Sequence, residues 1–129
     1  VGEIRVLIVD DQQSVRKGLQ SLLAFSPEVQ VVGQAVNGSD ALCVAAECHP
    51  DVVLMDIQMP VMDGLEATRR IKDQWPEIRV IVLTMYARYQ AKALASGADL
   101  FLLKGCMPQV LQDAILAQRQ SPPGRVEQI

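Results

Sequence analysis

The sequence is poor in aromatic residues, in clustered positive charge and in long hydrophobic runs, and each shortage argues against one kind of core, partner or location. Aromatic side chains make up only 4% of the 129 residues, so a core must be built mainly from aliphatic side chains. The net charge is −3 and no block of Lys and Arg occurs, which argues against nucleic-acid binding by this segment. No hydrophobic run approaches the ~20 residues of a membrane-spanning helix, and no signal-peptide pattern opens the chain.

Cysteine and histidine are scarce as well. The three cysteines lack Cys-x-x-Cys spacing, and they fit free thiols in a reducing cytoplasm better than a disulfide framework or a zinc site. The single histidine, His49, precedes Pro50 and is expected at a helix end or on the surface. We therefore expect a cytoplasmic protein with no membrane partner.

Strand and helix patterns alternate along the chain, and 129 residues, half of them hydrophobic, are enough for one domain with a real core. The expected strands are about 4–9, 30–35, 52–55, 78–83 and 99–103, and the expected helices are about 13–25, 39–48, 65–74, a short one that ends at 96, and one around 110–115. Ser39 is a candidate N-cap of the second helix.

Most of the expected strands are apolar almost throughout, as is typical of parallel strands that helices cover on both faces. Right-handed crossovers then give a three-layer α/β sandwich. The predicted fold is flavodoxin-like, with a five-stranded parallel sheet in the order 2-1-3-4-5 and five helices. In such sheets ligands bind outside the carboxyl ends of the strands.

Four of the apolar runs end on polar residues that can do chemistry. The runs and the residues that follow them are 4–9 with Asp10 and Asp11, 52–55 with Asp56, 80–83 with Thr84, and 100–103 with Lys104. In a parallel sheet these groups meet at one edge. At ~4 Å and an effective dielectric constant near 20, each pair of carboxylates repels by about 4 kcal/mol. Mg²⁺ would relieve this repulsion, since it takes oxygen ligands and binds phosphate.

Asp56 also fits the role of a nucleophile. A carboxylate that faces an activated phosphoryl group can attack it and form an aspartyl phosphate. Mg²⁺ and Lys104 would neutralise the phosphoryl oxygens, and Thr84 could donate a hydrogen bond to one of them. A lone Asp after a strand is usually a turn former or helix cap, and a lone Lys is usually solvated. All of these groups at one sheet edge favour the chemical interpretation.

The chain resembles the receiver domain of two-component response regulators over residues 3–120. The motifs that carry the resemblance are Val9-Asp10-Asp11, Asp56-Ile57-Gln58-Met59-Pro60-Val61-Met62-Asp63-Gly64, Leu83-Thr84, and Gly97-Ala98-Asp99-Leu100-Phe101-Leu102-Leu103-Lys104. The segments 81–85 and 97–99 are most similar to the subfamily with a C-terminal helix-turn-helix domain of the LuxR/NarL type. Residues 1–120 would then be the receiver domain, and 121–129 would begin a linker to an output domain absent from this chain.

The resemblance implies a chemical role for the residues at the sheet edge. Asp56 would accept a phosphoryl group from the phosphohistidine of a sensor histidine kinase, with Lys104 balancing charge. Asp11 and Asp56 would ligate Mg²⁺ directly, together with the backbone carbonyl of Gln58. Asp10 would act on the ion mainly through water.

The resemblance also implies how the signal is read. Thr84 and Phe101 would be the switch residues that move on activation, and Gln58 and Tyr86 would tune the lifetime of the phosphate. A homodimer formed through the last helix and its neighbours is expected on activation. The sequence departs from the family pattern in two ways: the stretch from Thr84 to Gly97 is short, and Gly105 replaces the usual Pro or Asp after the lysine, so no cis-proline is expected there.

Three functions compete at this point. The favoured one is a phosphoacceptor switch, which at most catalyses its own phosphorylation and dephosphorylation and reaches DNA only through a domain outside this chain. A second is a stand-alone or unphosphorylated receiver that acts by protein contact. A third is a Mg²⁺-dependent phosphatase, but such enzymes place nucleophile and acid as Asp-x-Asp, whereas Asp10 and Asp11 are adjacent. No glycine-rich phosphate loop supports a nucleotide-binding Rossmann domain.

Overall fold

The computed structural model describes residues 3–120, so the expected linker at 121–129 lies outside the described residues. Five parallel strands form one sheet in the order β2-β1-β3-β4-β5. The strands are β1 (Ile4–Val9), β2 (Val29–Ala35), β3 (Val52–Met55), β4 (Arg79–Thr84) and β5 (Leu100–Leu103). The helices are α1 (Gln13–Leu23), α2 (Gly38–Cys48), α3 (Gly64–Gln74), α4 (Gln90–Ala95) and α5 (Pro108–Gln120), and a 3₁₀ turn, η1 (Ala87–Tyr89), leads into α4.

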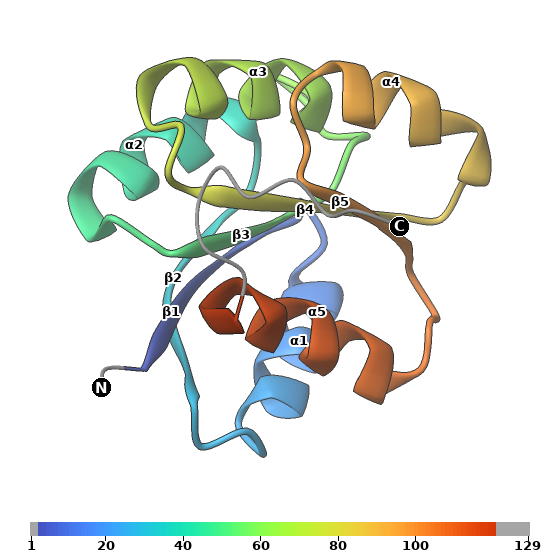
Figure 1. Cartoon of the computed structure of the whole chain (residues 1–129). Coiled ribbons are helices and arrows are strands. Elements are labelled where there is room, and N and C mark those ends of the chain that lie inside the picture. The colour runs from blue at the N-terminus through green and yellow to red at the C-terminus, as the bar shows by residue number, and fades with distance from the viewer. Residues whose placement is uncertain (1–2, 121–129) are drawn as a thin grey trace.

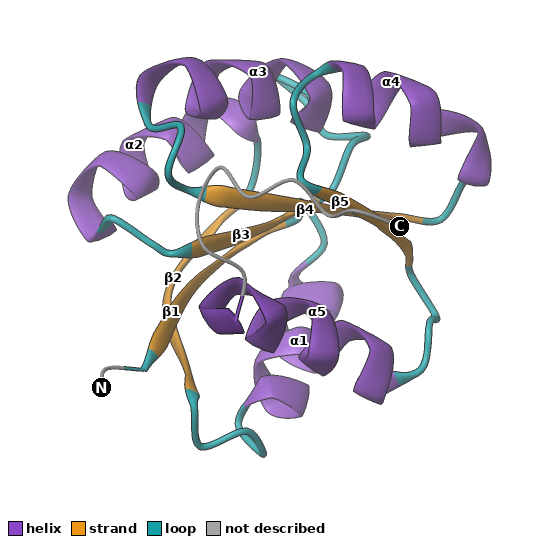
Figure 2. Cartoon of the chain, viewed as in Figure 1, coloured by secondary structure: helices purple, strands orange, loops and turns teal. Residues whose placement is uncertain are grey.

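Helices cover both faces of the sheet. α2, α3 and α4 lie on one face, and α1 and α5 lie on the other (Figure 1). Figure 2 shows the strands as a single layer between the two layers of helices. The predicted three-layer architecture, its five α-helices and its strand order are confirmed for the part of the chain that is described. None of the helices within residues 3–120 has the length and apolar character that a membrane span requires.

Each face of the sheet has its own aliphatic core. Successive side chains of a strand point to opposite faces. β1 therefore sends Leu7 and Val9 to the core under α2 and α3, and Ile4, Val6 and Ile8 to the core under α1 and α5. Burial on both faces explains why the central strands are apolar throughout. These two cores hold the strands in register and so fix where each strand ends.

Two expected helix boundaries are wrong. α1 ends at Leu23 rather than at Phe25, because Leu23 is its last buried position and Phe25 is 83% exposed. The N-cap of α2 is Asn37 rather than Ser39: the Asn37 side chain accepts a hydrogen bond from the Asp40 amide at 2.8 Å. With the cap at Asn37, the helix begins at Gly38.

The conformation of the loop after β5 depends on Gly105, which follows Lys104. Gly105 has φ of 88°, a left-handed conformation that favours glycine, and a Cβ there would meet nothing within 4 Å. The bond from Lys104 to Gly105 is trans, as are the other peptide bonds of the described residues. Conformation, and not lack of space, therefore accounts for glycine at this position.

Val61, in the loop between β3 and α3, has a backbone conformation that strains a β-branched residue. Its φ is 71°, and its side chain is 85% exposed, so little burial offsets the strain. Replacing Val61 by Gly is expected to raise the free energy of unfolding by about 1 kcal/mol. Urea denaturation checks this, and an unchanged or lower midpoint at equal slope would contradict it.

Candidate functional site

The strand ends bring the predicted site residues to one edge of the sheet. The Asp56 amide donates a hydrogen bond to the Val9 carbonyl at 3.0 Å, which extends the pairing of β1 and β3 beyond the strands. The Lys104 amide donates to the Thr84 carbonyl at 2.7 Å and does the same for β4 and β5. Thr84 is the last residue of β4 rather than the residue after it. The polar residues at the strand ends are therefore neighbours at the carboxyl edge, as the sequence pattern predicted.

Three carboxylates form a cluster there. One oxygen from each of Asp10, Asp11 and Asp56 lies within 4.8 Å of the others. Asp10 and Asp56 are buried, with 2% and 8% exposure, whereas Asp11 is exposed. The Gln12 amide donates to Asp10 Oδ1 at 2.9 Å, and the Arg16 guanidinium donates to the Asp10 main-chain oxygen at 2.7 Å. Asp10 is thus held at both its side chain and its backbone.

Lys104 extends from the end of β5 into this cluster. Its Nζ lies 2.7 Å from Asp10 Oδ2 and 3.2 Å from Asp56 Oδ1. The lysine is therefore the counter-ion of both buried carboxylates. Because the Gln12 amide binds the other oxygen of Asp10, both oxygens of that carboxylate already have protein partners.

The positive charge of Lys104 offsets only part of the cost of holding the Asp56 carboxylate ionised in this cluster. Burial and the charge of Asp10 raise the pKa of Asp56, and Lys104 opposes this only in part. Burial alone would lower the pKa of Lys104, but its hydrogen bond to Asp10 and the charges of Asp56 and Asp10 raise it overall. The ionised Asp56 would therefore be relieved by a further cation.

The cluster borders a cavity of about 310 Å³. Its lining residues are Asp11, Gln12, Val15, Asp56, Gln58, Thr84, Met85, Tyr86 and Lys104. Two of the predicted site residues do not line it. The Asp10 carboxylate accepts a hydrogen bond from Lys104 instead, and Phe101 is half-buried against the core under α2 and α3.

Three partners of the site were not predicted from the sequence. Gln12 acts through its backbone amide, which no residue type encodes. Arg16 is a basic residue in the helix that follows the aspartate pair, and that position could have suggested a contact with the loop. The hydroxyl of Tyr89 accepts a hydrogen bond from Gln58 Nε2 at 3.0 Å, which depends on the path of the loop after β4.

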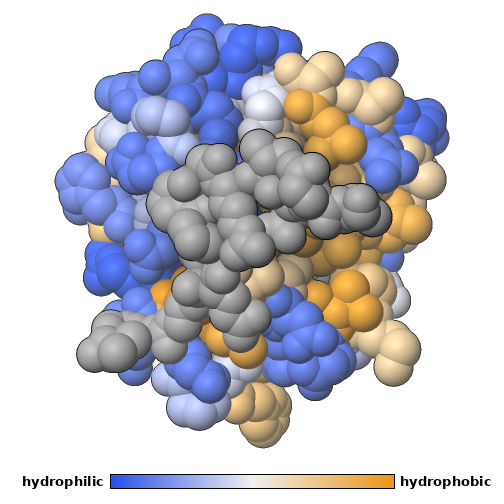
Figure 3. Space-filling model, in the orientation of Figure 1, coloured by the Kyte–Doolittle hydropathy of each residue, from blue (hydrophilic) through white to orange (hydrophobic). Residues whose placement is uncertain are grey.

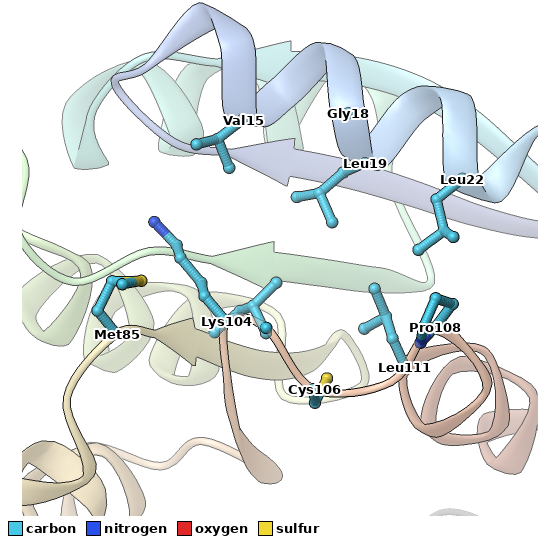
Figure 4. Close-up of a pocket in the computed structure, with 11 residues that line it drawn as sticks. Val15, Gly18, Leu19, Leu22, Met85, Lys104, Cys106, Pro108 and Leu111 are labelled. Atoms are coloured by element: carbon cyan, nitrogen blue, oxygen red, sulfur yellow. The ribbon is translucent and has the colours of Figure 1, made fainter.

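A second, apolar cavity of about 340 Å³ adjoins the first. Its lining residues are Val15, Gly18, Leu19, Leu22, Leu83, Met85, Lys104, Gly105, Cys106, Pro108 and Leu111. Figure 4 shows the side chains of α1 facing those of the segment from Lys104 to Leu111, with Lys104 at one end. Val15, Met85 and Lys104 line both cavities, so the acidic site opens beside a largely apolar surface.

Comparison with known proteins identifies the family. Residues 6–116 match the family model of the response regulator receiver domain. The chain belongs to this family. The response regulator protein VraR of Staphylococcus epidermidis is 41% identical over 114 residues, which are 87% of this chain and 54% of VraR. This receiver domain therefore spans about half the length of the curated relatives that it matches.

Solved structures agree with the family assignment. The receiver domain of the putative response regulator NarL from Mycobacterium tuberculosis has a TM-score of 0.87 at 31% identity, with 97% of this chain and 100% of that chain covered. A DNA-binding response regulator of the LuxR family from Staphylococcus aureus has a TM-score of 0.82 at 29% identity, with 89% and 98% covered. The predicted family is confirmed, and the chain is a phosphoacceptor switch rather than an enzyme.

Proposed function

We propose that this receiver domain takes a phosphoryl group on Asp56 from the phosphohistidine of a sensor histidine kinase in the cytoplasm. The observation that carries the proposal is the position of Asp56 in the acidic cavity, with its Oδ1 3.2 Å from Lys104 Nζ. The other Asp56 oxygen makes no hydrogen bond or ion pair with a side chain of residues 3–120, and it is the candidate attacking atom. Attack on the phosphorus of the phosphohistidine forms the aspartyl phosphate and releases the imidazole.

The donor set fits Mg²⁺. The clustered side chains are all carboxylates, which suit Mg²⁺ and not zinc. Asp11 and Asp56 would ligate the ion directly, with the Gln58 carbonyl. Asp10 would act mainly through water, because both of its oxygens are bound by Lys104 and by the Gln12 amide. When bound, the ion neutralises charge on the phosphoryl oxygens.

Mg²⁺ binding gives the first test. At 100 times its dissociation constant, the ion is expected to raise the free energy of unfolding by about 2.7 kcal/mol. Asp11→Asn should remove most of this gain, and since Asp11 is exposed the variant should still fold. Asp73→Asn, an exposed change on α3, is the matched control and should keep the gain. Absence of a Mg²⁺-dependent shift in thermal unfolding would favour an unphosphorylated receiver.

Thr84 and Phe101 are the proposed switch residues. Thr84 is buried and lines the same cavity as Asp56, which supports a response of its side chain to a phosphoryl group there. Its carbonyl is bonded to the Lys104 amide, and Phe101 lies on β5 three residues before Lys104. A phosphoryl group can shift the domain between two states only through contacts that differ between them.

The kinase has to present its phosphohistidine at the mouth of the acidic cavity, where the apolar cavity between α1 and α5 adjoins it. Gly18 lines that apolar cavity, and a Cβ there would meet nothing within 4 Å. Gly18→Glu should fold, since there is room for the side chain and glycine has a lower helix propensity than glutamate. Transfer from the cognate kinase should fall roughly tenfold or more, since ~1.4 kcal/mol of lost binding suffices. Labelling by acetyl phosphate should be unchanged, and equal loss from both donors would contradict this docking surface.

We further propose that phosphorylation controls transcription through an output domain outside this chain. The LuxR-family DNA-binding response regulator among the similar structures supports this role. Exposed apolar side chains lie on α4, at the end of β5 and on the segment that begins α5: Leu94, Leu103, Met107 and Val110. Figure 3 shows apolar residues gathered on this side of the molecule, and such a patch supports homodimer formation on activation.

A further inference from the structure

The short loop after β4 connects to the phosphorylation site through one hydrogen bond. Gln58 is two residues beyond Asp56 and lines the acidic cavity. Its Nε2 donates to the hydroxyl oxygen of Tyr89, at the end of η1, at 3.0 Å. This bond joins the β3–α3 loop to the segment that departs most from the family pattern.

The tyrosine ring is itself held in place. Tyr89 is half-buried and packs against the core under α2, α3 and α4. The Arg88 guanidinium carbon lies 4.3 Å from the centroid of the Tyr86 ring and 5.1 Å from that of the Tyr89 ring. The two rings meet edge to face with centroids 6.3 Å apart. Both tyrosines of this aromatic-poor chain are used here, and together they fix the hydroxyl that faces Gln58.

A fixed acceptor orients the amide. With one Nε2 hydrogen directed to Tyr89, the plane of the Gln58 amide can no longer rotate freely. The amide oxygen remains available to accept a hydrogen bond from a water molecule at the cavity. A water that is oriented before reaction attacks faster than one that is free, because the cost of ordering it has been met in advance.

We propose that Tyr89 is a positioning residue for hydrolysis of the Asp56 phosphate, through its hydrogen bond to the Gln58 amide. This inference rests on the proposed phosphorylation of Asp56. In the step, the water oxygen bonds to phosphorus, and the bond between phosphorus and the Asp56 oxygen breaks. The Asp56 carboxylate is restored, and the phosphate leaves with both protons of the water. The Gln58 oxygen orients the attacking water, and Tyr89 orients Gln58.

The lifetime of the phosphorylated protein tests this role. Tyr89→Phe removes the hydroxyl and keeps the ring, and it is expected to slow hydrolysis about fivefold, which corresponds to about 1 kcal/mol. Gln58→Ala should be at least as slow. The double variant should match Gln58→Ala alone, because Tyr89 acts only through Gln58. Lys92→Ala, an exposed change on α4 away from the apolar patch, is the control and should keep the wild-type rate.

The experiment loads each protein with acetyl phosphate and Mg²⁺, removes the donor, and follows the loss of label relative to its starting level. An unchanged rate in Tyr89→Phe would overturn the inference. So would an equal slowing by Tyr89→Phe in the Gln58→Ala background, since a structural effect would not depend on Gln58. A wild-type chain that takes no label would overturn the proposed function itself, so the two failures are distinguishable.

Discussion

Replacing Asp56 by Asn is expected to abolish labelling by a phosphorylated kinase or by acetyl phosphate. Asparagine is nearly the same size but has no carboxylate to attack phosphorus, so the loss should be complete rather than partial. Labelling on a gel that separates phosphorylated from free protein is the measurement. The exposed variant Asp73→Asn should label like the wild type. Labelling of Asp56→Asn at the wild-type rate would mean that another residue is the acceptor.

The same substitution is expected to stabilise the fold at neutral pH. Burial and the charge of Asp10 raise the pKa of Asp56 above its ordinary value of 3.8. The folded chain therefore holds this proton more tightly than the unfolded chain does. Stability then falls as the pH rises from 3.8 through the raised pKa, and the ionised carboxylate is unfavourable above it. Asp56→Asn cannot ionise, so it avoids this cost.

The stability gain should accordingly depend on pH. It should be present at about pH 7 and shrink as the pH falls toward about 4, where Asp56 of the wild type takes up a proton in both states. Urea denaturation at several pH values measures it. A gain of the same size at low pH would point to a packing effect of the amide instead of to charge.

The second large effect is expected for Lys104→Met. Loss of the ammonium removes the only protein cation that contacts Asp56 among the described side chains, and labelling should fall about 10²–10³-fold, as for other groups that stabilise developing charge. The variant should also unfold more easily, by about 3 kcal/mol, because two buried carboxylates lose their counter-ion. Initial labelling rates and urea denaturation measure the two effects.

Mg²⁺ separates the two roles of Lys104. The ion can replace part of the missing charge, so it should restore more of the stability of Lys104→Met than of its labelling rate. Lys104→Arg keeps the charge with a different geometry and should retain stability better than Lys104→Met. Labelling of Lys104→Met at the wild-type rate would contradict a role for the ammonium in phosphoryl transfer.

The sequence carried enough information for the sheet and for the edge that holds the site. Strands buried on both faces read as continuous apolar runs, and the first polar residue after each run marks its carboxyl end. Asp10, Asp56, Thr84 and Lys104 were found in this way, and the structure brings them together. Helix ends were less predictable, because Ser39 and Asn37 are both good caps and only the backbone decides between them.

The pattern of apolar and polar residues does not predict the direction of a single side chain or the path of a loop. Asp10 and Asp11 are adjacent and of one type, yet the first is buried against Lys104 and the second is exposed. The contact between Gln58 and Tyr89 depends on how the short segment after Thr84 folds back over the site. No periodicity encodes such a contact, since neither residue belongs to a regular strand.

Phosphorylation of Asp56 can be measured directly by mass spectrometry of the wild-type chain after incubation with acetyl phosphate and Mg²⁺. Phosphorylation of Asp56 predicts one phosphoryl group per chain, on the peptide that contains Asp56, and no phosphoryl group when Mg²⁺ is chelated before the donor is added. A phosphoryl group on another residue, such as His49, would contradict the assignment of Asp56 as the acceptor. So would an unlabelled chain under conditions in which Mg²⁺ measurably stabilises the fold.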